Sequence, residues 1–106
     1  METPPVDAFQ VIADPSRRRM LDLLSQDSLT INALARHFNI SRPAVSKHVR
    51  ILESGGFITI HDIGRERHCV LKKDGFDQIR DWASHFDRFW STKLRRLETL
   101  LRNQTR

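Results

Sequence analysis

The first half of the chain repeats apolar residues at the three- and four-residue spacing of amphipathic helices. Four helices are predicted from this spacing, at 6–13, 15–25, 31–38 and 42–54. Asp14, Thr30 and Ser41 are the expected N-caps of the last three, because their side-chain oxygens can accept a free backbone N–H. Pro15 and Pro43 suit a first helical turn, where no hydrogen bond is lost.

After a glycine pair the pattern changes to alternating apolar and polar positions, which is typical of half-buried strands. Two strands are predicted, at 57–62 and 67–72. Gly64 followed by Arg65 suits a two-residue type II′ hairpin loop. The opposed pairs that this loop predicts include Ile60 with Cys69 on the apolar side and His61 with His68 on the other. Cys69 is therefore interpreted as a small core residue, in preference to a reactive thiol.

A long final helix is predicted at 75–102, and its apolar residues form one stripe along its whole length. A body of four short helices and one hairpin is too small to cover such a stripe, so part of it is expected to contact another chain. Phe86, Phe89 and Trp90 are the expected anchors of that interface. The alternative is that the whole stripe belongs to the core of a single chain.

The length of 106 residues fits one domain, 1–106, with a thin core that favours dimerisation. Eighteen Lys and Arg against thirteen Asp and Glu give a net charge of +5, which favours a polyanionic partner, although a soluble basic protein without one is the alternative. The run Arg17 to Arg19 is expected to be exposed. One cysteine excludes an internal disulfide, and no leader or long apolar run suggests a membrane, so a cytoplasmic location is expected.

The order of the predicted elements is typical of a winged helix-turn-helix. The helices at 31–38 and 42–54 are separated by a three-residue turn, and a hairpin wing with a basic tip follows at 57–72. On a helical wheel, the polar side of 42–54 carries side chains suited to base edges in a DNA major groove: Arg42, Ser46, Lys47 and Arg50. A merely solvated face is the alternative. His48 falls on the apolar side and is expected to be a hydrogen-bonded residue at the edge of the core.

Three segments carry a family resemblance: ADPSRRRMLDLLS at 13–25, LTINALARHFNISRPAVSKHVRILESGGFI at 29–58 and GRERHCVLK at 64–72. They resemble the ArsR-type winged-helix repressors over nearly the whole chain. The resemblance implies a mainly helical domain with a small β-hairpin wing that dimerises through its first and last helices and binds a palindromic operator as a transcriptional repressor. The implied DNA contacts are Ser41, Arg42, Pro43, Ser46, Lys47, His48, Arg50, Arg65 and Arg67. The expected dimer contacts are Phe9, Ile12, Phe86, Phe89, Trp90, Leu94, Leu97 and Leu101.

The usual metal sites of that family are not expected here. The family's thiolate site needs cysteines at positions that this chain fills with Thr30, Asn32 and Ala35. A second family site, on the last helix, does not match the spacing of Asp81 and His85. No metal or cofactor is therefore predicted, and the sequence does not identify an effector. The pair His61 and His68 could begin a zinc site, but a third ligand is not evident and a solvated pair is favoured. The pair could also make wing binding pH-dependent.

The predicted function is a homodimeric repressor that places the helix 42–54 in the major groove of double-stranded DNA and the wing tip 62–67 on the adjacent groove. The alternative is a protein-binding winged helix that sequesters a partner through its aromatic last helix and does not read DNA. An enzyme is not expected, because no nucleophile, carboxylate pair or phosphate loop is arranged near any of the five histidines.

Overall fold

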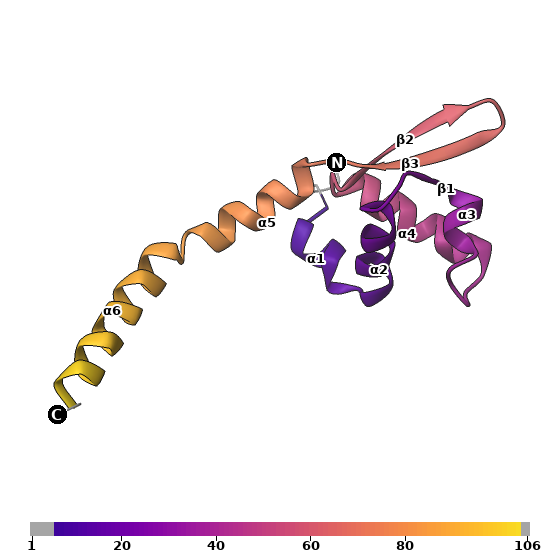
Figure 1. Cartoon of the computed structure of the whole chain (residues 1–106). Helices are drawn as coiled ribbons and strands as arrows, with labels where there is room; N and C mark the ends of the chain where they lie inside the picture. Colours follow the sequence, from indigo (N-terminus) through magenta and orange to yellow (C-terminus); the bar gives the residue numbers. More distant parts are fainter. Residues whose placement is uncertain (1–5, 105–106) are drawn as a thin grey trace.

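A computed structural model describes residues 6–104 and has the predicted fold class, a mainly helical winged helix-turn-helix with a small antiparallel sheet (Figure 1). The helices are α1 (Ala8–Ala13), α2 (Pro15–Leu24), α3 (Ile31–Ala35), α4 (Arg42–Ser54), α5 (Asp74–Ser84) and α6 (Asp87–Gln104). The strands are β1 (Leu29–Thr30), β2 (Ile58–Ile63) and β3 (Glu66–Leu71).

The predicted N-caps are confirmed. The carboxylate of Asp14 accepts from the backbone N–H of Arg17 at 3.0 Å, and the hydroxyls of Thr30 and Ser41 accept in the same way at the starts of α3 and α4. Three helices are shorter than predicted, α2 by the single residue after Leu24. Asp7 caps the first helix, so it begins at Ala8. The third ends at Ala35 because the next backbone bonds span three residues instead of four, which tightens the chain into the turn before α4.

The hairpin has the predicted register, with Ile60 opposite Cys69 and His61 opposite His68. Gly64 has a φ of +62°, as the first residue of a type II′ loop requires. The sheet nevertheless has three strands, not two, because the short segment Leu29–Thr30 pairs with β3 in the order β1-β3-β2. A two-residue strand is too short to show an alternating pattern. Its pairing joins the wing directly to the start of α3.

The core lies between α1 to α4 and the base of the wing. Its buried apolar residues are Ala8, Val11, Met20, Leu21, Leu24, Ile31, Leu34, Val45, Val49, Leu52, Phe57, Ile58 and Cys69. Burial raises the pKa of the Cys69 thiol to about 11, so the group is protonated at neutral pH. The predicted role of Cys69 as a small core residue is thereby confirmed.

The last predicted helix forms an arm that leaves the body on the side away from the hairpin tip (Figure 1). The arm is not one continuous helix: at His85 and Phe86 the backbone N–H groups bond three residues back, and this tight turn separates α5 from α6. The arm starts in close contact with the body, since a Cβ on Gly75 would lie 2.7 Å from the Phe57 ring. Within 87–104, α6 buries no residue.

The arm makes the molecule long. The principal extents are 70 × 37 × 22 Å, and the radius of gyration is 19.7 Å, against about 13 Å for a compact domain of this length. The hypothesis that the whole apolar stripe is intramolecular core is therefore wrong. Of the two expected interface residues on α1, Phe9 is exposed and packs edge-on against Trp82, whereas Ile12 is half-buried against the core. None of the helices within residues 6–104 is apolar enough over a sufficient length to span a membrane.

Candidate nucleic-acid interface

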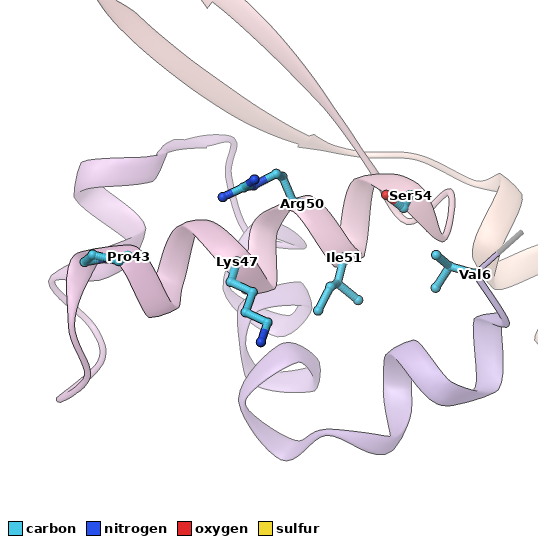
Figure 2. Close-up of a pocket in the computed structure, with 6 residues that line it drawn as sticks. All are labelled: Val6, Pro43, Lys47, Arg50, Ile51 and Ser54. Atoms are coloured by element: carbon cyan, nitrogen blue, oxygen red, sulfur yellow. The ribbon is translucent and has the colours of Figure 1, made fainter. Parts of the chain in front are cut away.

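Helix α4 presents one side to the core and the other to solvent. Val45, Val49 and Leu52 are buried against the body. On the opposite side a shallow depression runs along the helix, lined by Val6, Pro43, Lys47, Arg50, Ile51 and Ser54 (Figure 2). Figure 2 shows Lys47 and Arg50 leaving α4 in different directions from neighbouring turns. The predicted division of this helix into a packing side and a polar side is confirmed.

Lys47 and Arg50 are the two unengaged cations of this face. Both are exposed, and neither forms a hydrogen bond or ion pair with another residue of the described chain, 6–104. An unpaired Lys or Arg on an exposed helix can donate to a guanine edge or to a phosphate without first breaking an internal contact. These two side chains are therefore ready to accept a polyanionic ligand.

Arg42 and Ser46 differ from them because each already has an internal partner. The Nε of Arg42 donates to the side-chain oxygen of Asn32 at 2.8 Å, and its Nη1 donates to the hydroxyl of Ser46. These bonds hold the guanidinium of Arg42 between the start of α3 and the first turns of α4. The sequence pattern predicts that Arg42 and Ser46 face outward but not that they are bonded to each other.

His48 lies on the packing side of α4, as its place on the wheel predicts. Its Nδ1 is 3.2 Å from Nη1 of Arg17 and 3.9 Å from the carboxylate of Asp14, and the side chain is only 20% exposed. Arg17 also donates to the carbonyls of Gln10 and Val11 at the end of α1. His48 thus helps to hold α4 against the joint between α1 and α2.

The predicted exposed run is confirmed at Arg18 and Arg19, whereas Arg17 is half-buried. Arg18 nevertheless donates to the carbonyls of Ile12 and Ala13. The last carbonyls of a helix have no partner within it, so cationic donors stabilise them well. Arg19 lies 5.4 Å above the ring of Phe38. All three arginines therefore also make contacts within the body.

The wing tip carries Arg65 and Arg67, both exposed as predicted. Arg67 donates through Nε to the carboxylate of Asp62 at 3.2 Å, whereas Arg65 has no hydrogen bond or ion pair among residues 6–104. Together with the free cations of α4, the tip makes a discontinuous basic surface.

The histidine pair on the wing is formed but is not joined by a third ligand. Nε2 of His61 is 3.0 Å from the hydroxyl of Thr59, and Nε2 of His68 is 3.7 Å from the carboxylate of Glu66. Within residues 6–104, no group of three or more His, Cys, Asp or Glu side chains is arranged to hold a metal. On the arm, Nδ1 of His85 lies 2.8 Å from the carbonyl of Asp81 in the preceding turn.

Asn32 and Arg17 are the residues near this surface that the sequence pattern does not single out. Each contacts a residue of α4 from another helix, and such a pairing leaves no periodic signal along the chain. Asn32 could have been suspected only from its place in the first turn of α3, where it stands beside the turn that leads to Arg42.

Known proteins are similar to this chain in sequence and in fold. A family model for a helix-turn-helix domain matches residues 12–61. The transcriptional repressor SdpR of Bacillus subtilis is 35% identical over 80 residues, which are 76% of this chain and 89% of that protein.

Two solved structures have the same fold. The crystal structure of an ArsR family transcriptional regulator is 35% identical, with a TM-score of 0.75 over 80% of this chain and 93% of that one. The NMR structure of a homodimeric winged helix-turn-helix DNA-binding domain from Mycobacterium bovis is 19% identical, with a TM-score of 0.62 over 76% and 78% of the two chains. At that identity the second likeness concerns the fold alone.

Proposed function

The chain belongs to the ArsR family of winged helix-turn-helix transcriptional regulators, and from this premise we propose that it is a homodimeric repressor that binds a palindromic operator. Helix α4 enters the major groove, and the wing tip 62–67 lies on the adjacent groove. The observation that carries the proposal is the exposed side of α4, where Lys47 and Arg50 project from the helix without a hydrogen-bond or ion-pair partner among residues 6–104. Side chains that are free and fixed to a rigid helix suit base readout.

The proposed DNA contacts fall into three groups with different tasks. Lys47 and Arg50 would read base edges. Ser41 can donate its hydroxyl proton to a phosphate while its oxygen caps α4, and Pro43 stands in the first turn of the helix. The remaining contacts of the proposed surface are Arg42, Ser46, His48, Arg65 and Arg67. Among these, His48 would act mainly by holding α4 in position, because its ring faces Arg17.

The dimer is proposed from the uncovered apolar side of the arm. Its exposed members, with one residue of α1, are Phe9, Phe86, Phe89, Trp90, Leu94, Leu97 and Leu101, and the half-buried Ile12 lies at the edge of the set. A contiguous apolar face of this extent is typical of an interface. A two-fold dimer would present two α4 helices to two half-sites, which is why a palindromic operator is proposed.

The test begins by selecting genomic DNA fragments that the protein retains and measuring affinity by fluorescence anisotropy at several salt concentrations. If six to ten phosphates are neutralised, log affinity should fall with log salt at a slope of about −6 to −9. The selected fragment should bind at least about a thousandfold more tightly than random duplex DNA. Equal affinity for both DNAs would overturn the proposal.

The uncovered arm also favours a second candidate function, sequestration of a different protein through α6. The two functions predict different free states. A homodimer would show twice the chain mass by light scattering at micromolar concentration, whereas a sequestering protein would show one chain mass. A monomer that binds random and selected DNA equally would support this second candidate.

A further inference from the structure

Between the wing and the helix-turn-helix lies a cleft lined by residues from four elements. Its lining residues are Thr30, Ile31, Asn32, Arg42, Arg65, Glu66 and Arg67. Three of them are arginines and one is an acid, so the cleft carries a net positive charge. We propose that this cleft clamps one phosphate of the DNA backbone in each half-site, with Arg42 as the fixed donor. The inference rests on the proposed function and gives Arg42 a different task from that of Lys47 and Arg50.

The position of the cleft follows from the way a winged helix straddles DNA. The two grooves of a duplex are separated by a sugar–phosphate strand. A protein with one element in the major groove and another on the adjacent groove must let that strand pass between them. The cleft lies at this junction, because Arg42 begins α4 and Arg65 and Arg67 belong to the wing tip.

Arg42 is prepared for this task by its two internal bonds. A guanidinium has five N–H donors, and the bonds to Asn32 and Ser46 use two of them, which leaves about three for a ligand. The same bonds restrict the side chain to one orientation, so little conformational entropy is lost when an anion binds. A side chain that reads bases must match the edge of a particular base, whereas a phosphate presents the same oxygens at every sequence. A guanidinium held in one orientation is therefore better suited to bind a phosphate.

The opposite wall of the cleft supplies further donors, from Arg65 and Arg67. Arg67 is held only through Nε by Asp62, which leaves its two terminal nitrogens free, and Arg65 has no partner among residues 6–104. Glu66 also lines the cleft, but its carboxylate lies 3.7 Å from Nε2 of His68. The two walls are joined by the pairing of Thr30 with His68, so the cleft keeps its width.

The proposed phosphate contact is tested with a duplex in which single backbone phosphates are replaced by neutral methylphosphonates. For the wild-type protein, one position in each half-site should lower affinity about 10- to 100-fold, the effect of losing a charged hydrogen bond. Arg42→Ala should lower affinity for the unmodified duplex by a similar factor. It should cause little further loss on the modified duplex, because both changes remove the same contact.

Three further variants separate the parts of the proposal. Asn32→Ala keeps the charge of Arg42 but removes one of the two bonds that hold its side chain, and should lower affinity about two- to tenfold. Arg50→Ala should change preference among single-base variants of the site, whereas Arg42→Ala should weaken all of them equally. Arg80→Ala, an exposed arginine on α5, is the matched control and should bind as the wild type does. Circular dichroism checks that each variant is folded.

The outcomes distinguish failure of the clamp from failure of the proposed function. If wild-type protein binds the selected site specifically but Arg42→Ala alters base preference and keeps its methylphosphonate sensitivity, Arg42 reads bases and only the clamp is overturned. If the wild type shows no specific binding, the proposed function itself fails. Calorimetric titration with inorganic phosphate tests whether the cleft binds a free anion instead of a DNA phosphate. Saturable binding to the DNA-free protein that Arg42→Ala abolishes would assign the cleft to a free anion and overturn the DNA clamp.

Discussion

Helices α4 and α6 are both amphipathic, yet only α4 has its apolar side covered by the same chain. Val45, Val49 and Leu52 of α4 are at most 1% exposed, whereas Leu94 and Leu97 of α6 are 59% and 52% exposed. Helices α2 and α3 and strand β2 contact α4, while α6 projects away from the body (Figure 1). An apolar stripe shows that a face must be covered. It does not show whether the cover comes from the same chain or from another.

The polar sides of the two helices also differ. On α4 the polar side receives a contact from another helix, since the side chain of Asn32 accepts a hydrogen bond from Arg42. On α6 the hydrogen bonds of Thr92 and Thr99 go to carbonyls one turn back in the same helix. A surface that recognises a shaped ligand needs side chains in fixed positions. The structured polar side of α4 therefore fits recognition, and the apolar side of α6 fits assembly.

The largest expected effect comes from placing a charge on the apolar side of α6. Leu97→Asp would remove an apolar contact of about 1.5–3 kcal/mol from each protomer of the proposed dimer. The dissociation constant of the dimer should rise by roughly two to four orders of magnitude. Light scattering over a range of protein concentrations measures the change. Arg95→Asp places the same residue on the opposite side of α6 and should leave the dimer intact; a dimeric Leu97→Asp protein would show that this face is not the interface.

A second comparison uses two leucine truncations in the monomeric Leu97→Asp background. Leu52→Ala on α4 should lower the free energy of unfolding by about 2–5 kcal/mol, because it leaves a cavity in the core. Leu94→Ala on α6 should change it by less than about 0.5 kcal/mol, because its side chain is already exposed in a single chain. Urea denaturation followed by circular dichroism measures both. Equal losses would contradict the contrast between a covered α4 and an uncovered α6.

Sequence reasoning succeeded where the cause of a feature lies within a few residues. Ser41 caps α4 by accepting from Ala44, and Gly64 sets the hairpin register, so both could be predicted from local chemistry. The strand β1 could not, because it exists only through pairing with β3 much later in the chain. The break at His85 was also missed, since no proline or glycine marks it and the apolar stripe continues through it.

The same distinction applies to the candidate site. The helical wheel separates the outward residues of α4 from the inward ones, including His48. The wheel cannot show which of the outward cations form hydrogen bonds with other side chains, as Arg42 does, and which do not. The bond between Asn32 and Arg42 joins residues ten positions apart, and the contact between Arg17 and His48 joins residues 31 apart. Such contacts depend on how the helices pack. The different proposed roles of Arg42 and Arg50 can therefore be inferred only from the structure.

The smallest of these effects concerns Cys69. It tests whether the core formed by α1 to α4 and the base of the wing stays packed when the protein is monomeric. Burial raises the pKa of its thiol from 9.0 to about 11 in the folded chain. The folded state therefore holds the proton more tightly, and the resulting stabilisation is complete below pH 9 and lost as the pH rises toward 11. Two pKa units correspond to about 2–3 kcal/mol. Urea denaturation between pH 8.5 and 10.5 should show most of that loss in the wild type and in Leu97→Asp, but not in Cys69→Ala. If Leu97→Asp alone lacked the loss, the core of the body would depend on the dimer, and the contrast between α4 and α6 would fail.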